Sequence, residues 1–523
     1  MTDAVQVEAT ERRALAGAPG LLLALAAGAA AGLAHPPFGF LPGLLGFALL
    51  LHVIDAAPLG RWRRAAFARG WAAGFGYFLV GTWWVGEAFM VDAAAHGWQA
   101  PFAMALLPAG LGLFWGAAAL AYRAAAPKGP LRVLVFAALF ALTEWLRGHV
   151  LTGFPWDLPG EAWKAGGAVS QTAALVGVYG LSLVTLAIGA APAVFGGPDS
   201  RRARIATVGA AALVLAALWA FGATRVAQAR VADTGLVVRM VQPNIPQAMK
   251  WSPAEFRAIV ERYVSLTAAP AARTPDVVVW PESAIPDAAN RVLASGTWTL
   301  DAIVGALTPN QVLLAGLYRE EGDKPRYYNS LIALRRQGGD LALLGLYDKH
   351  TLVPFGEYLP LEGWLDKLGL SALAGFGESF TAGRPPRPMT PAGLPRLQPL
   401  ICYESLFPGY ARGPDRPAWI VNVSNDAWFG RTSGPLQHLN LASYRAIEQG
   451  VPLVRSTPTG VSAMIDALGR TRASLGSGES GVLDAVLPGA LPPTPYSRWG
   501  DAPFWGMTLA GLACAIRRRK AKS

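Results

Sequence analysis

The sequence predicts a multi-span α-helical membrane bundle joined to an α/β layered domain outside the membrane. Hydrophobic residues make up 53% of the 523-residue chain and charged residues only 15%, whereas soluble proteins carry about 25% charged residues. The apolar residues gather in blocks, and one long interval instead alternates short β-rich runs with helical patterns. A chain of this length also exceeds what one core needs, so we expect more than one structural unit.

About eight apolar blocks are candidates for membrane spans, each of which needs about 20 residues. They cover residues 14–33, 39–56, 68–88, 101–122, 130–147, 168–195, 204–222 and 502–516. The last block is short and relies on flanking residues to reach the membrane interface. We therefore expect an N-terminal membrane domain of seven spans over 1–224, and a last span with a basic tail over 498–523.

The basic residues indicate the topology of these spans. Every second connection is basic, and the alternate connections are poor in Arg and Lys. The clusters are Arg12 and Arg13; Arg61, Arg63, Arg64 and Arg69; Arg123, Lys128 and Arg132; Arg201, Arg202 and Arg204; and Arg517, Arg518, Arg519, Lys520 and Lys522. By the positive-inside rule both termini are cytoplasmic and the long interval faces outward. The net charge of +11 therefore encodes topology, and no nucleic-acid partner is expected.

The interval 225–497 predicts an α/β domain of its own. Its β-rich runs are Leu236–Gln242, Asp276–Trp280, Val312–Tyr318, Ser330–Leu334, Leu341–Asp348, Gln398–Tyr403, Trp419–Ser424 and Leu453–Thr457. Many are continuous apolar runs, as expected of strands buried on both faces. Helical patterns intervene over Pro253–Ala268 and Gln437–Gly450, and strands that alternate with helices indicate a layered α/β fold.

Three chemically active side chains stand at the ends of predicted strands in this interval. Glu282 comes after Val277–Trp280 and Pro281, Lys349 after Leu341–Asp348, and Cys402 after Pro399–Ile401. Groups at strand ends project into a shared crevice. A thiol near an ammonium has a lowered pKa, and a carboxylate can accept its proton. The ammonium and the main-chain N–H of Tyr403 are natural donors to an oxyanion.

Each of these residues also has an ordinary structural interpretation. A Cys after an apolar strand is often a small buried hydrophobe, and Lys349 could form a surface ion pair with Asp348. Glu282 could be a carboxylate at a helix N-terminus. A Cys–His pair is a further possibility, because His350 follows Lys349 and His438 lies in a predicted helix.

The surrounding strings carry a resemblance to a known family. Trp280-Pro281-Glu282-Ser283, the run from Tyr347-Asp348-Lys349-His350 to Pro354-Phe355-Gly356-Glu357-Tyr358, and Ile401-Cys402-Tyr403-Glu404 occur in that order. These strings follow predicted membrane spans in the sequence, and in this combination the sequence resembles the nitrilase superfamily in its apolipoprotein N-acyltransferase branch. Further similar strings are Val241–Gln247, Lys250-Trp251, Asn425–Gly430, Glu144–Gly148 and Thr152–Trp156. Pro243 stands where the family commonly has glycine.

The resemblance implies a nitrilase-like αββα sandwich and a membrane acyltransferase. Cys402 would take an acyl chain from a phospholipid, typically phosphatidylethanolamine, and pass it to the N-terminal amine of a diacylglyceryl-cysteine apolipoprotein. Glu282 would be the base and Lys349 the oxyanion stabiliser, with Glu357 holding Lys349. Trp251, Tyr403 and Glu404 would shape the site. The implied location is the bacterial inner membrane, with the catalytic domain in the periplasm and no cofactor.

Several alternatives remain at this stage. A membrane-anchored amidase or nitrilase would use the same trio with water as acceptor, although a soluble amide needs no membrane bundle. A non-enzymatic scaffold predicts loss of one trio member, and a transporter predicts more mid-span charges than are found. Phe407, Trp428 and Phe429 are either lid residues or core aromatics. Metal binding is not expected, because no His/Asp/Glu cluster has ligand spacing.

Overall fold

The computed structural model describes residues 15–358, 379–413 and 415–516. The described residues form two compact units. The helical unit comprises the chain up to Ala229, Thr432–Glu448 and the chain from Pro493 onward. The α/β unit comprises Arg230–Arg431 and Gln449–Pro492. The two units cut across the predicted interval 225–497, because one internal helix groups with the membrane-like helices.

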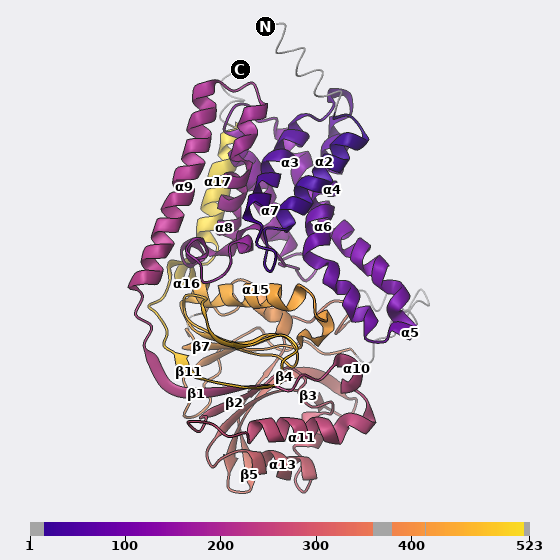
Figure 1. The fold of residues 1–523 in the computed structure, drawn as a ribbon, viewed down its shortest axis with the longest axis vertical. Helices are drawn as coiled ribbons and strands as arrows, with labels where there is room; N and C mark the ends of the chain where they lie inside the picture. Colours follow the sequence, from indigo (N-terminus) through magenta and orange to yellow (C-terminus); the bar gives the residue numbers. More distant parts are fainter. Residues whose placement is uncertain (1–14, 359–378, 414, 517–523) are drawn as a thin grey trace. The chain divides into compact units, whose positions relative to one another are not determined.

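Every predicted apolar block contains helix. The longer helical segments of the helical unit are α2 (Ala18–Gly32), α3 (Gly46–Asp55), α4 (Trp62–Thr82), α6 (Ala100–Ala125), α7 (Arg132–Arg147), α8 (Ala173–Ala190), α9 (Arg201–Gln228), α15 (Gly434–Gln449) and α17 (Ala502–Ile516) (Figure 1). Within the described residues, three segments are long and apolar enough to cross a membrane: Ala93–Ala125, Val169–Gly196 and Arg201–Gln228. Two further helical segments, Leu41–Asp55 and Leu59–Met90, are bent by 94° relative to each other. The number rises to four if this pair is counted as one span. The count of eight spans stays a prediction.

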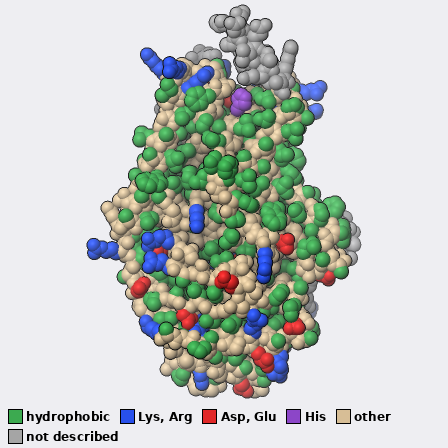
Figure 2. Space-filling view, viewed as in Figure 1, with side chains coloured by type: hydrophobic (Ala, Val, Ile, Leu, Met, Phe, Trp, Pro, Cys, Tyr) green, Lys and Arg blue, Asp and Glu red, His purple; other side chains and the backbone are tan. Residues whose placement is uncertain are grey.

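Small residues allow the helices of this unit to pack closely. A Cβ on Gly28 of α2 would lie 1.8 Å from the carbonyl oxygen of Ala73 in α4, so only glycine fits there. Close approach through small residues is the usual means by which apolar helices associate in lipid. Outward-facing side chains of the unit are largely hydrophobic in Figure 2, with Lys and Arg gathered near the start of α9. This pattern agrees with a membrane environment.

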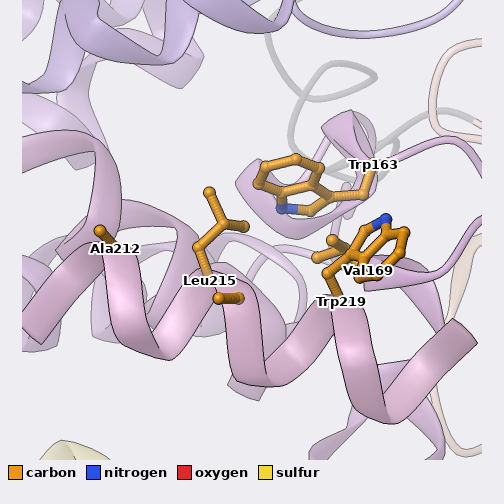
Figure 3. A pocket seen from close by; sticks show the side chains of 6 residues that line it. Trp163, Val169, Ala212, Leu215 and Trp219 are labelled. Carbon is orange, nitrogen blue, oxygen red and sulfur yellow. The ribbon is translucent and has the colours of Figure 1, made fainter. Parts of the chain in front are cut away.

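Helix α9 is the least buried of the apolar segments, with 6% of its apolar window buried. It touches the rest of the helical unit at Gly222, where a Cβ would lie 1.7 Å from the carbonyl oxygen of Ala168. Nearer the middle of α9 an open groove of about 460 Å³ remains beside the helix (Figure 3). Its lining is Trp163, Val169, Ala212, Leu215, Ala216 and Trp219. None of these described lining residues is ionisable, so the groove is not a candidate catalytic site.

Helix α15 is the predicted helix 437–450, and it packs in the helical unit. Tyr444 and Ile447 belong to that unit's hydrophobic core. Gln437 Oε1 accepts hydrogen bonds from the indole N–H groups of Trp84 at 3.0 Å and Trp156 at 3.2 Å. These contacts over a sequence distance of hundreds of residues explain why the helix groups with the N-terminal helices.

The α/β unit contains two sheets. The six-stranded sheet has the order β11-β1-β2-β3-β4-β5, and the five-stranded sheet the order β10-β9-β8-β7-β6. The strands are β1 (Asp233–Gln242), β2 (Val277–Trp280), β3 (Val312–Glu321), β4 (Arg326–Gln337), β5 (Asp340–Asp348), β6 (Leu397–Ile401), β7 (Trp419–Val423), β8 (Leu453–Ser456), β9 (Ser462–Ile465), β10 (Thr471–Leu475) and β11 (Gly481–Pro488). All eight predicted runs form strands, whereas β9 to β11 were not predicted. Strand β10 is short and partly exposed, so its sequence carries little periodic signal.

The layers of this unit explain where the strand ends lie. Helices α11 (Phe256–Thr267) and α13 (Trp298–Ala306) cover one face of the six-stranded sheet, side by side in Figure 1. The opposite face packs on the five-stranded sheet, for example Leu314 with Val421 in one core. β1, β2 and β3 run parallel to one another, as do β6, β7 and β8. The carboxyl ends of β2 and β6 therefore open on loops that can carry a site.

Candidate active site

Cys402 directly follows β6 and adopts a backbone conformation that is rare for a residue with a side chain. The strand ends at Ile401, two residues before the predicted end, and Cys402 has a φ of 49°. Left-handed conformations at non-glycine residues are strained and gather at functional sites. The Glu404 carboxylate accepts a 2.8 Å hydrogen bond from the Ile401 N–H and holds this turn.

Glu282 lies in a tight turn after β2. The following residue, Ser283, also has a left-handed φ of 47°. The Ala284 N–H donates to the carbonyl oxygen of Gly316 in β3 at 2.8 Å. A Cβ on Gly316 would lie 2.4 Å from the Pro281 carbonyl oxygen, so the turn can pack here only against glycine. The neighbouring strand thus fixes the position of the carboxylate.

Lys349 lies between two carboxylates and is fully buried. Its Nζ is 3.2 Å from Glu282 Oε1 and 2.9 Å from the carboxylate of Glu357. Asn329 of β4 supports both carboxylates, because its Nδ2 donates to Glu282 Oε1 at 2.6 Å and to Glu357 Oε1 at 2.9 Å. The Val353 N–H donates to Glu357 Oε2 at 2.9 Å. The two acids and the lysine therefore form one connected network.

This network determines the charge of Glu282 and Lys349. Burial by itself raises the pKa of Glu282, but the Lys349 charge and the hydrogen bonds of Asn329, Lys349 and the Cys402 thiol outweigh it, and the pKa is lowered. Burial by itself lowers the pKa of Lys349, but the charges of Glu282 and Glu357 outweigh it, and the pKa is raised. Both groups are ionised at neutral pH, as a base and an oxyanion stabiliser require.

The electrostatics of Cys402 differ from the sequence-based expectation of a thiol with a lowered pKa. Burial and the negative charge of Glu282 raise the pKa of Cys402 well above its ordinary value, and the Lys349 charge only partly opposes them. The thiol is therefore protonated at rest and donates a hydrogen bond to Glu282. A thiol in this state can attack a substrate by passing its proton to the carboxylate, and not as a preformed thiolate.

Glu404 connects the loop after β5 to the turn after β6. Its Oε1 accepts from the Tyr347 hydroxyl at 2.6 Å and from the His350 N–H at 2.8 Å. Its Oε2 accepts from the Ile401 N–H at 2.8 Å. The carboxylate is fully buried, and burial raises its pKa. Glu404 therefore holds the two segments that carry Lys349 and Cys402 at a fixed spacing.

The remaining predicted residues differ in their exposure. Tyr403 is buried, and its ring meets Phe407 edge to face at a centroid distance of 5.2 Å. Phe407 is therefore a core aromatic, whereas Trp428 is 38% exposed. Trp251 is 51% exposed beside Tyr318. These exposures leave Trp251 and Trp428 free to meet a substrate.

The two histidines make contacts with other groups. The His350 ring Nδ1 bonds the carbonyl oxygen of Gly383 at 2.9 Å. His438 lies in α15 of the helical unit, where its ring packs 5.6 Å from that of Trp156. Within the α/β unit, Glu282 is hydrogen-bonded to the Cys402 thiol.

Sequence reasoning did not identify Asn329 or Lys250 as site residues. Asn329 stands with Ser330 directly before the apolar run of β4 and is buried, so a polar residue next to an apolar strand run was its signal. Lys250 is buried with its Nζ 3.4 Å from the Glu282 carbonyl oxygen. It ends the short helix α10 (Gln247–Lys250) before Trp251, and nothing in the local sequence pattern indicates that it is buried.

Comparisons with known proteins identify the family of the chain. The carbon-nitrogen hydrolase family profile matches residues 237–491, and the profile of the apolipoprotein N-acyltransferase N-terminal domain matches residues 27–191. An apolipoprotein N-acyltransferase of Caulobacter vibrioides is 56% identical over 508 residues, which are 96% of this chain and 95% of the relative. Those of Brucella melitensis and Bradyrhizobium diazoefficiens are 43% and 41% identical, over 93% and 96% of this chain and 92% and 95% of theirs. The chain belongs to the apolipoprotein N-acyltransferase family.

Proposed function

We propose that the chain is a membrane N-acyltransferase that moves an acyl chain from a phospholipid through Cys402 to the N-terminal amine of a diacylglyceryl-cysteine apolipoprotein. The observation that carries this proposal is the thiol of Cys402 hydrogen-bonded to Glu282, whose carboxylate shares the buried Lys349 with Glu357. A scaffold with a degenerate site would not need to keep such a costly buried network.

In the first half-reaction Glu282 takes the thiol proton while Sγ attacks the ester carbonyl carbon of the phospholipid. The Lys349 ammonium and the Tyr403 N–H stabilise the resulting oxyanion. The ester C–O bond then breaks, and protonated Glu282 returns the proton to the departing lysophospholipid oxygen. The product is a thioester on Cys402.

In the second half-reaction the α-amine of the apolipoprotein attacks the thioester carbon. Glu282 accepts a proton from the amine, the C–S bond breaks, and that proton returns to the sulfur. The apolipoprotein acceptor now carries the acyl group in an amide bond, and the thiol of Cys402 is restored. Glu357 keeps Lys349 charged and oriented in both steps, and Trp251 contributes to the lipid side of the site.

We further propose the finer topology that the resemblance implies. The proposed frame has eight spans, both termini in the cytoplasm, the αββα domain in the periplasm of a bacterial inner membrane, and phosphatidylethanolamine as donor. In Figure 1 the start of α9 and the C-terminal end of α17 lie at the same end of the helical unit. This supports placing both ends on the same side of the membrane. The basic start of α9, Arg201, Arg202 and Arg204, supports the cytoplasmic side.

Mass spectrometry of the detergent-purified protein tests the covalent step. With a labelled phospholipid we expect one acyl group on the peptide that contains Cys402, and none with Cys402→Ser. Product formation by Cys402→Ser at the wild-type rate would refute the nucleophile. Lys349→Met removes the charge at similar length and should abolish single-turnover acylation; an unchanged rate would refute the oxyanion role.

The acceptor is tested with matched peptides. A synthetic diacylglyceryl-cysteine peptide with a free α-amine should gain an amide-linked chain, and its N-acetylated counterpart should not. Release of free fatty acid at the same rate with either peptide would instead indicate an amidase-like enzyme that uses water. The comparison separates the two acceptors because donor, thiol and thioester are the same.

A further inference from the structure

A second lysine is buried beside the proposed base. Lys250 ends α10 (Gln247–Lys250) and is 3% exposed. Its Nζ lies 3.4 Å from the main-chain oxygen of Glu282. Within the described parts of the chain, this oxygen is the single hydrogen-bond acceptor of an ammonium that has three N–H groups. A lysine is rarely buried so completely unless a charge nearby compensates it.

Helix α10 is attached to the site on a second side. Gln247 Oε1 accepts a 3.0 Å hydrogen bond from Asn425 Nδ2, and both side chains are buried. The main-chain N–H of Asn425 in turn donates to the sulfur of Cys402. One short segment therefore touches the surroundings of the base at Lys250 and those of the nucleophile at Gln247.

Among the described residues, the Glu282–Lys349–Glu357 network carries one excess negative charge. Glu282 and Glu357 contribute two negative charges, and Lys349 between them contributes one positive charge. A buried charge without a counterion is costly. In the part of the chain that the structure describes, three further ionisable groups face this network: the Cys402 thiol, which is protonated, Glu404, which contacts Lys349 electrostatically, and Asp426, which faces Cys402. Asp426 is itself paired with Arg455 at 2.7 Å.

We propose that Lys250 is a positioning residue that compensates the buried charge of the Glu282–Lys349–Glu357 network and keeps Glu282 ionised and in place. This proposal rests on the proposed role of Glu282 as the base. Burial lowers the pKa of Lys250 to about 8, against the opposing charge of Glu282. The ammonium is therefore still charged at neutral pH, where the base has to be ionised.

The sign of the effect follows from the charge. A positive group favours the carboxylate form of Glu282, so its removal raises the pKa of Glu282. The reactivity of Cys402 needs ionised Glu282 as proton acceptor. It therefore falls in acid, where the pair formed by the Cys402 thiol and the Glu282 carboxylate gains its second proton. Because the contact is to the carbonyl oxygen and not to the carboxylate, we expect the smaller end of the usual range, a shift of about one pH unit.

The test measures alkylation of Cys402 by iodoacetamide against pH, in the full-length detergent-solubilised protein. A Cys514→Ala background removes the other thiol. We expect Lys250→Met and Lys250→Gln to move the acid limb of the alkylation rate upward by about one unit, and Lys250→Arg to leave it near the wild-type position. Lys324→Met, which removes a charge in the exposed turn after β3, should not move it.

Several results would overturn the proposal. A wild-type limb in Lys250→Gln would show that the hydrogen bond matters and the charge does not. A uniform loss of rate in both neutral variants, without a shift, would indicate a purely structural role. If Lys250→Met fails to fold, the comparison of Lys250→Gln with Lys250→Arg still separates charge from shape. Glu282→Gln should move the limb much further; if it does not, the base itself is wrongly assigned.

Discussion

Replacement of Glu404 by glutamine tests whether one buried carboxylate holds the loops of Lys349 and Cys402 together. Glu404 Oε1 serves the Tyr347 hydroxyl and the His350 N–H, and Oε2 serves the Ile401 N–H at 2.8 Å. A glutamine of the same shape can offer only one oxygen. Whichever way the amide lies, its NH₂ group faces a main-chain N–H, and at least one buried donor loses its acceptor.

The cost follows from those contacts. A buried donor without an acceptor costs about 1–3 kcal/mol. Burial raises the pKa of Glu404, so the desolvation of the carboxylate already offsets part of the strength of its hydrogen bonds. We therefore expect Glu404→Gln to lose about 2 kcal/mol, which lowers the Tm of a unit of this size by about 4–8 °C. Glu404→Ala should lose more, because both oxygens disappear.

The assay combines thermal unfolding in detergent with the rate of Cys402 alkylation. Glu261→Gln is the control, because Glu261 is 61% exposed and pairs with Arg257 at 3.6 Å on the helix surface. Such exposed pairs contribute about 0–1 kcal/mol. An unchanged Tm together with an unchanged alkylation rate in Glu404→Gln would refute the idea that this carboxylate sets the spacing of the site.

Further predictions concern the same network. Gly316→Ala should lower both stability and acylation rate, because the new Cβ would lie 2.4 Å from the carbonyl oxygen before Glu282; wild-type acylation would contradict the packing argument. Asn329→Ala removes two donors to carboxylates and should slow acylation about tenfold or more, measured by single-turnover mass spectrometry. The lowered pKa of Glu282 stabilises the fold above a glutamate's ordinary pKa of about 4.3 and loses this effect as pH falls through the folded pKa. The raised pKa of Lys349 stabilises below its ordinary pKa of about 10.4 and loses this effect as pH rises through the folded pKa. Unfolding of wild type and of Lys349→Met across pH checks both signs.

Much of the site was predictable because it depends on local order. A strand buried on both faces forms a continuous apolar run, and the polar residue that ends the run lies at the sheet edge. Glu282 and Cys402 follow strands of this kind, whereas β5 before Lys349 is an edge strand that is largely exposed or half-buried. The structure brings the three side chains together. The apolar blocks likewise predicted where the helices of the helical unit lie, although only some reach the length that a bilayer requires.

The sequence by itself determined which residue types follow the strands, because strand and helix periods are local properties of the chain. Tertiary structure alone decided their protonation and their support. The raised pKa of Cys402 comes from burial and from Glu282, 120 positions earlier in the chain. The burial of Lys250 and of Asn329 depends on their contacts with Glu282, which is distant from both in the sequence. The placement of α15 with the N-terminal helices depends on contacts such as Gln437 with Trp84. Burial and long-range charge sum over neighbours that are distant in sequence, and no local pattern encodes them.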